Sequence, residues 1–262
     1  MTEPFLHLAD AEVGPDDPFA VARRLAEDRA GRALEVVGEY VVPPAGGEPT
    51  RPFQTLHVDF GMPLAPVRPA DVATYTALHV PVGAATEGAT TRLVPLDDLL
   101  AQRAWPEPAE LLRRIEAYGR THGAWDDDEG YVEGSLARLA EAADGVALLP
   151  SVKAEPGFLC GLEFDDAEGE LQHLRALGLD VPAVAVDVLL EPGDVLVFDN
   201  HAVAHGRVGR RLPGELHQRF FGHRAAGVDE QLRMRDRLLA RFASPGSVGA
   251  RVEGPVEQQR TA

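Results

Sequence analysis

The chain has 262 residues, of which 45% are hydrophobic, and a formal net charge of −17 at pH 7. This length suits one sizeable domain and is too short for two comfortable ones, so we expect a single domain over residues 1–262. The negative charge argues against a nucleic-acid partner, because phosphate contacts require a basic surface.

Cysteine content and hydropathy bear on the compartment. The single cysteine, Cys160, rules out an internal disulfide and indicates a reducing environment. No run of residues is apolar over a bilayer-spanning length, and the first residues are acidic where a secretory signal would be basic. We expect a cytoplasmic protein without a membrane partner, and the sequence does not indicate its oligomeric state.

Short β-branched runs and amphipathic stretches follow one another along the chain, with proline and glycine between them. Before residue 193, strands are expected at 33–42, 56–60, 72–82, 91–95, 146–150, 157–164 and 184–190. Helices are expected at 18–28, 96–103, 107–118, 132–143, 167–177 and 228–243. This order predicts a mainly β protein with flanking helices, built on a double-stranded β-helix, or jelly roll.

One inserted segment, THGAWDDDEGYVEG at 121–134, is charged and aromatic and carries Gly123 and Gly130. Such a glycine-hinged insertion is typical of a lid over an active site, and equally of an ordinary surface loop. Both interpretations stay open for this segment.

The stretch 193–224, GDVLVFDNHAVAHGRVGRRLPGELHQRFFGHR, predicts a strand, a turn at 212–214 and a returning strand. Because side chains alternate along a strand, His205 in the first arm and Arg219 in the second can face one cavity. Alone, each residue has an ordinary interpretation, as a strand-end histidine or a solvated arginine.

A second segment, LHVDF at 56–60, contains possible metal-ligand partners for His205. Residues i and i+2 of a strand project to one face, so His57 and Asp59 can bind one metal ion. A His-x-Asp spacing is common by chance, and the indication comes from its combination with His205 and Arg219.

At these residues the chain resembles the Fe(II)/2-oxoglutarate-dependent oxygenases, within them the taurine dioxygenase and clavaminate synthase-like group. The resemblance rests on HVD at 57–59, GDVLVFDNHAVAHGR at 193–207 and LHQRFFGHR at 216–224. It implies that His57, Asp59 and His205 bind iron and that Arg219 binds the distal carboxylate of 2-oxoglutarate. It also implies that a threonine of the GATT segment, Thr91 or else Thr90, contacts this cosubstrate.

The chemistry of these residue types agrees with the implied roles. Two imidazoles and one carboxylate occupy one face of an octahedral ion and leave three positions for cosubstrate and O2, which suits non-haem iron. A guanidinium group matches a carboxylate with two parallel hydrogen bonds.

The resemblance further implies hydroxylation of a substrate, with release of succinate and CO2. It does not identify the substrate, for which we expect a small polar metabolite, with amino-acid-like compounds as one candidate class. Desaturation or cyclisation by the same family remain alternatives, and halogenation is disfavoured because Asp59 supplies a carboxylate where related halogenases have a small residue. Candidate substrate contacts are Thr55, Trp125, Asp127 and Glu163.

Two rival functions use the same residues differently. A zinc hydrolase would use the three metal ligands to activate water, which leaves Arg219 without a role and requires a general base that we cannot place. A jelly-roll binding protein without catalysis would keep the fold, but the joint presence of all four polar anchors favours an enzyme.

Overall fold

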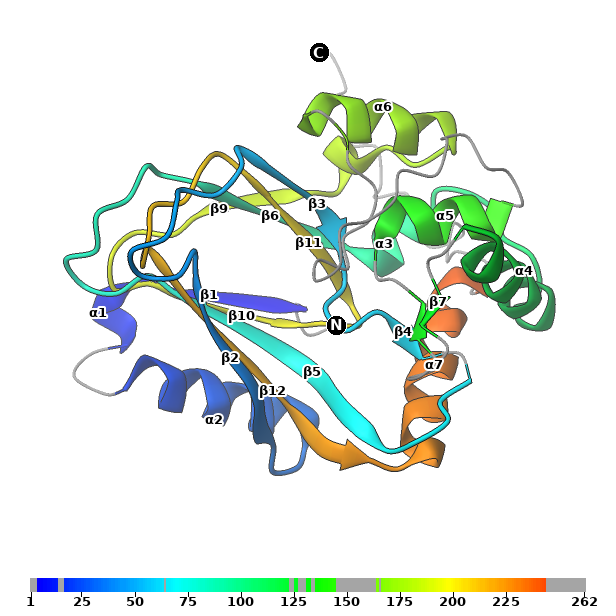
Figure 1. The fold of residues 1–262 in the computed structure, drawn as a ribbon, viewed down its shortest axis with the longest axis horizontal. Coiled ribbons are helices and arrows are strands. Elements are labelled where there is room, and N and C mark those ends of the chain that lie inside the picture. Colours follow the sequence, from blue (N-terminus) through cyan, green and yellow to red (C-terminus); the bar gives the residue numbers. More distant parts are fainter. Residues whose placement is uncertain are drawn as a thin grey trace, which may run out of the picture.

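The computed structural model describes residues 4–13, 17–63, 65–122, 125–126, 131–132, 135–144, 164 and 166–243. Within them, two antiparallel sheets face each other, and helices lie on their outer sides (Figure 1). The larger sheet contains, in spatial order, β1 (Phe5–Leu8), β10 (Val195–Asp199), β5 (Ala70–His79), β12 (Leu216–Ala226) and β2 (Glu35–Val42). The smaller sheet contains β3 (Phe53–His57), β11 (Val203–Val208), β6 (Thr90–Pro95) and β9 (Val186–Leu189). The predicted mainly β, jelly-roll architecture with flanking helices is confirmed.

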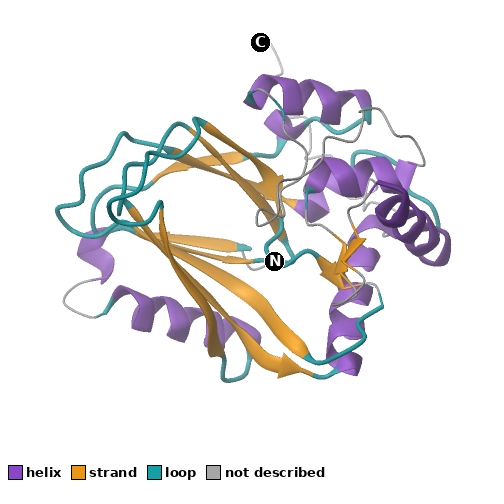
Figure 2. Ribbon diagram, in the orientation of Figure 1, coloured by secondary structure: helices purple, strands orange, loops and turns teal. Residues whose placement is uncertain are grey.

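Figure 2 shows the helix of residues 18–30 beneath the larger sheet and most of the other helices gathered at one end of the two sheets. The helices before residue 125 are α1 (Asp10–Val13), α2 (Pro18–Ala30), α3 (Leu96–Leu100) and α4 (Pro108–His122). Those after it are α5 (Leu136–Asp144), α6 (Ala167–Ala176), the 3₁₀ helix η1 (Val181–Ala183) and α7 (Val228–Ala243). Helix α2 packs on the larger sheet, whereas a cluster built mainly from α3 to α7 packs on the smaller one.

The start of α2 follows from local sequence. Asp17 is the N-cap residue, and its carboxylate accepts a hydrogen bond of 3.0 Å from the backbone N–H of Phe19. Pro18 occupies the first helical position, where its missing N–H costs nothing. Phe19, Ala22 and Ala26 then lie buried on one stripe against the larger sheet.

Strand β10 shows how alternation divides the core. Val195 and Val197 pack under α2, whereas Leu196 and Phe198 point between the two sheets. Side chains directly opposite one another in an antiparallel pair share a face, so this pattern also assigns faces on the neighbouring strands β5 and β12.

The predicted hairpin at 193–224 is wrong in its pairing. Strands β10 and β12 lie on either side of β5, and an additional strand, β11, belongs to the smaller sheet. The reason is a tight turn after β10, closed by the Ala202 N–H bonded to the Asp199 carbonyl at 3.1 Å, which ends the first arm early.

The remaining predicted elements before residue 145 and after residue 166 have counterparts, with α7 at the predicted bounds 228–243. The strand predicted at 56–60 is displaced, because β3 ends at His57 and Asp59 lies in the turn that follows. The strands predicted at 146–150 and 157–164 fall outside the described residues, except Phe164. No helix in the described part of the chain is both long enough and apolar enough to cross a membrane.

Candidate active site

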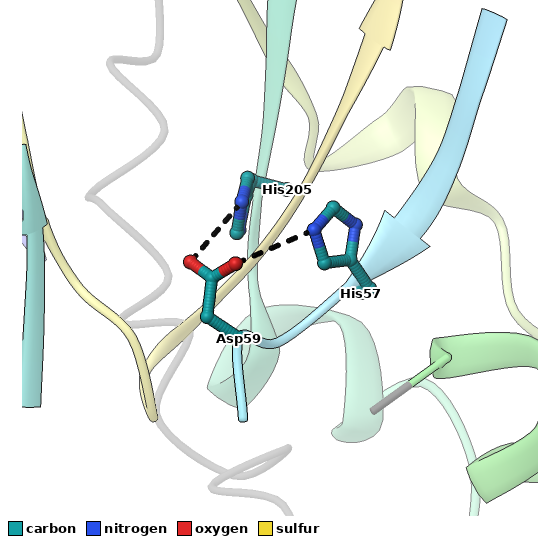
Figure 3. Close-up of side chains that lie close together, drawn as sticks. All are labelled: His57, Asp59 and His205. Carbon is teal, nitrogen blue, oxygen red and sulfur yellow. Dashed lines mark ion pairs between the residues drawn. The ribbon is translucent and has the colours of Figure 1, made fainter. Parts of the chain in front are cut away.

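Three predicted ligands converge between the sheets (Figure 3). One ligand atom from each of His57, Asp59 and His205 lies within 4.8 Å of the others. The Asp59 carboxylate lies 3.6 Å from His57 Nε2 and 3.4 Å from His205 Nε2. His57 ends β3, Asp59 follows in the next loop and His205 lies directly opposite His57 on β11, so pairing of the two strands builds the cluster.

Neighbouring groups orient these side chains. His57 Nδ1 lies 2.8 Å from the Thr55 carbonyl, which leaves Nε2 free to face the cluster. Thr76 on β5 donates its hydroxyl hydrogen to Asp59 Oδ2 at 2.8 Å. The Phe198 ring lies 4.7 Å from the His205 ring, between centroids, and shields it. Side chains of the larger sheet therefore restrict the orientations of Asp59 and His205, which belong to the loop after β3 and to the smaller sheet.

Sequence reasoning missed Asn200, which is fully buried and joins the Asp59 loop to the larger sheet. Its Oδ1 accepts from the Asp59 N–H at 2.8 Å, and its Nδ2 donates to the carbonyls of Asp59 at 2.8 Å and Ala73 at 3.3 Å. The signal was present as the DN dipeptide of the turn after β10, but only the fold shows what the amide reaches.

Asn200→Ala should therefore loosen the Asp59 loop. Loss of the amide leaves buried backbone groups without partners, so we expect the free energy of unfolding to fall by about 2 to 4 kcal/mol, together with weaker metal binding. Urea denaturation and metal titration measure both. A change within about 0.5 kcal/mol, as is usual for surface substitutions, would contradict this role.

Backbone conformation next to the ligands is also constrained. Phe60 has a φ of 64°, which non-glycine residues rarely adopt, and its ring packs 5.1 Å from that of Phe220. At Gly206, a Cβ atom would lie 2.7 Å from the Gln54 carbonyl oxygen, so glycine allows β11 to approach β3 beside His205.

Electrostatics favour the ligand forms of two residues. Burial lowers the pKa of His205 to about 3, so its imidazole is neutral at pH 7. Burial alone would raise the pKa of Asp59, but His205, His57 and the Thr76 hydroxyl together hold it below its usual value. A neutral imidazole and an ionised carboxylate are the forms that bind a metal ion.

This donor set fits iron. Two histidines and one carboxylate, buried and pointing to one centre from one side, form the facial arrangement typical of non-haem Fe(II). The same three groups also suit zinc, so the ligands alone do not decide between the metals.

Arg219 does not join this cluster. It lies opposite Ala77 on β5 and Glu39 on β2, and Ala77 packs in the core beneath α2. Its Nη2 donates to Glu39 at 3.0 Å, and its guanidinium lies 4.3 Å from the centre of the Phe19 ring on α2. The expectation that Arg219 faces the cavity of His205 is therefore not met, because alternation along β12 points it to the outer face.

A different arginine reaches the predicted cosubstrate threonine. Arg211, 1% exposed, donates from Nη2 to Thr91 Oγ1 at 3.0 Å and from Nη1 to Glu215 at 3.2 Å. Thr91, rather than Thr90, is the residue bonded to it. Sequence reasoning missed Arg211 because it lies in the turn region before β12, where arginines are usually solvated.

Arg207 lies beside this group. Strands β11 and β6 are paired so that Arg207 lies opposite Thr91. Two residues earlier on β11, His205 lies opposite Leu93. Two residues of strand span about 7 Å, so this arginine and threonine lie one side-chain row from the metal ligands. Burial, followed by repulsion from Arg211, lowers the pKa of Arg207 to about 10, so Arg207 still carries its charge at pH 7.

The structure describes only two of the four predicted substrate contacts, Thr55 and Trp125. Thr55 is buried on β3 two residues before His57, and its Oγ1 has no hydrogen-bond partner among the described residues. Trp125 belongs to β7 (Trp125–Asp126), which pairs with β8 (Tyr131–Val132), and β8 pairs with β4 (Met62–Pro63), three residues after Asp59. Asp127, Glu163 and most of the segment 121–134 lie outside the described residues, so the lid stays a prediction.

Glu170 on α6 supports β3 from outside. Its Oε1 accepts from the Leu56 N–H at 2.8 Å, and burial raises the pKa of its carboxyl from 4.5 to about 7. A folded-state pKa above the unfolded one stabilises the protein below about pH 4.5, and this contribution is lost as pH rises through about 7.

Glu170→Gln should remove that pH dependence while keeping an acceptor for Leu56. We compare the free energies of unfolding of the wild type and the variant at each pH. The wild-type value minus the variant value should fall by up to about 3 kcal/mol from pH 4.5 to pH 8. Urea denaturation of both proteins across this range measures it. Parallel stability curves would show that Glu170 does not titrate as described.

A family model described as "Taurine catabolism dioxygenase TauD, TfdA family" matches residues 70–221. The match includes Thr91, His205 and Arg211 and begins after His57 and Asp59, whose role therefore depends on the geometry above.

Individual relatives are distant. An enduracididine beta-hydroxylase of Streptomyces hygroscopicus is 30% identical over 102 residues, which cover 34% of this chain and only 29% of that protein. PvcB, described as an Fe, alpha-ketoglutarate dependent oxygenase from an isonitrile synthetic pathway, is 15% identical with a TM-score of 0.41, covering 85% of this chain and 76% of PvcB. The non-heme iron oxygenase OrfP, solved in complex with Fe, is 16% identical with a TM-score of 0.31, covering 71% of this chain and 54% of OrfP.

Proposed function

Since the chain belongs to the taurine catabolism dioxygenase TauD, TfdA family, which uses iron and 2-oxoglutarate, we propose that His57, Asp59 and His205 bind the iron of this enzyme. The observation that carries the proposal is the convergence of the three side chains within 4.8 Å, although almost 150 residues separate His57 from His205. When bound, iron with 2-oxoglutarate and O2 supplies the oxidant and releases succinate and CO2.

The residues of the chain bind, orient and shield. Asp59 offsets part of the charge of a divalent ion, and Thr76 and the Thr55 carbonyl restrict the orientations of Asp59 and His57. His57 and His205 are 6% and 5% exposed, so little water reaches their rings. A site of low exposure strengthens the electrostatic interactions within it.

For the distal carboxylate of 2-oxoglutarate we propose Arg211 with Thr91, in place of Arg219. The support is that Arg211 Nη2 bonds Thr91 and that Thr91 lies one side-chain row from His205 on the shared face of the smaller sheet. Each Nη atom of Arg211 carries a second N–H, so both can donate to a ligand.

The reaction that we propose is hydroxylation of a small polar, amino-acid-like metabolite, which the name of the beta-hydroxylase relative supports over a short stretch only. Thr55 is the best supported substrate contact, because its buried hydroxyl lies near His57 without a partner among the described residues. Trp125, Asp127 and Glu163 stay predictions, as do a single domain over 1–262 and a lid at 121–134.

Succinate formation tests the reaction class. The protein with Fe(II), ascorbate and 2-oxoglutarate in air should form succinate, and anaerobic addition of Fe(II) and 2-oxoglutarate should give a weak visible absorption band. Mass-spectrometric screening of amino-acid-like metabolites should then find a product heavier by one oxygen. No succinate with Fe(II), combined with hydrolysis in the presence of Zn(II), would favour the zinc hydrolase instead.

A further inference from the structure

Counted over the residues that the structure describes, the Arg211–Thr91 site contains more buried positive charge than negative charge. Arg207 and Arg211 are 8% and 1% exposed, and Glu215, which bonds Arg211, is 1% exposed. Buried charges are normally paired, because removing an ion from water without a partner is costly. Two guanidinium groups therefore share one carboxylate.

The contacts of Arg207 show where the excess lies. Its Nη1 lies 2.5 Å from Thr50 Oγ1 and 2.6 Å from each of the carbonyl oxygens of Arg51 and Gly209, so its two N–H groups are shared among three acceptors. All three acceptors are neutral, and Arg207 has no ion pair within the described residues. Thr50 Oγ1 also accepts from the Arg211 N–H at 2.9 Å, so both arginines are anchored at the same threonine.

Glu215 is bound on both of its oxygens. Oε1 accepts from Arg211 Nη1, and Oε2 accepts from the Leu212 N–H at 2.6 Å. These bonds close the turn before β12, so the carboxylate cannot move away from Arg211 without breaking them. Arg211 is held at Nη1, and its Nη2 is directed at Thr91.

We infer that Glu215 is an internal counter-ion that sets the charge of the carboxylate site, cancelling one of the two guanidinium charges and leaving one for a single carboxylate ligand. Its second effect is to position Arg211 against Thr91. This inference rests on the proposed function insofar as 2-oxoglutarate supplies that carboxylate, but the charge balance is a property of the chain alone.

The charge balance predicts how the site responds when its charges are changed. Glu215→Gln keeps an acceptor for the Leu212 N–H and removes the negative charge, so two uncompensated guanidinium groups remain. Succinate should then bind the full-length, metal-free chain about tenfold more tightly than it binds the wild type, because an added unit of attraction acts at short range in a buried site. The melting temperature without ligand should be lower than in the wild type, since the guanidinium groups repel each other.

The experiment measures succinate binding to metal-free protein by calorimetry and by the shift in melting temperature, at low and high NaCl. Glu39→Gln is the matched control, because it removes the carboxylate partner of Arg219 on the outer face. That control should bind succinate as the wild type does. Unchanged or weaker succinate binding by Glu215→Gln would overturn the inference.

Arg207→Gln keeps the test decisive if Glu215→Gln does not fold, and the double variant adds a check if it does. Arg207→Gln removes the excess charge and should weaken succinate binding about tenfold, whereas Arg207→Gln/Glu215→Gln restores one net charge and should return toward the wild-type affinity. Wild-type succinate affinity in Arg207→Gln would overturn the inference. The expected binding pattern without succinate production from 2-oxoglutarate would instead reject the proposed function alone.

Discussion

His205→Ala is expected to lower iron-dependent succinate formation by at least about 100-fold, since changes to groups that only support a metal ligand already cost 10- to 100-fold. His205 is one of the three proposed ligands, and its imidazole is neutral at pH 7 because burial lowers its pKa to about 3. Without it, His57 and Asp59 offer two donors, too few to hold a divalent ion in a fixed orientation.

His79→Ala is the matched control for this variant. His79 is buried to a similar degree, 9% exposed against 5% for His205, but it lies beneath α2, with its ring 5.8 Å from that of Phe19. Its loss should reduce stability and leave iron binding unchanged. Equal iron affinity in His205→Ala and His79→Ala, measured by anaerobic titration, would remove His205 from the ligand set.

The second large effect is expected at Arg211. Arg211→Gln should weaken 2-oxoglutarate binding by about 2 to 4 kcal/mol, as is usual when one partner of a buried, charged hydrogen bond is truncated. Arg219→Gln should leave that binding unchanged, because Arg219 pairs with Glu39 and stacks on Phe19. Anaerobic titration of the visible band with Fe(II) bound compares the two variants directly.

The outcome separates two assignments. Loss of binding in Arg219→Gln, with wild-type binding in Arg211→Gln, would restore the assignment that the family resemblance implied. The stability of both variants must be measured as well, since Arg211 also bonds Glu215 within the turn before β12.

The convergence of His57, Asp59 and His205 is the part of the site that the sequence predicts well. His57 and Asp59 are two residues apart, at the end of β3 and in the loop that follows it, so a short local segment is enough to present both. Helices such as α7 were predictable for the same reason, because a stripe of apolar residues at helical spacing is a local signal. Asn200 and Glu170 carried no comparable signal, since each acts through a backbone group more than 100 residues away.

The sequence by itself therefore determined the candidate metal-binding residues, the family resemblance and the order of most strands and helices, because periodicity and short motifs are properties of neighbouring residues. Only the tertiary structure decided which arginine faces the site. Alternation along β12 points the Arg219 and Phe220 side chains to opposite faces of the larger sheet, but it does not say which face is the inner one. In the fold, Phe220 packs on Phe60 between the sheets, whereas Phe221 packs under α2, on the outer face that Arg219 shares. Arg211 comes from a turn that reads as exposed, and it is buried because Thr91, Glu215 and Thr50, two of them more than 100 residues away, meet it there.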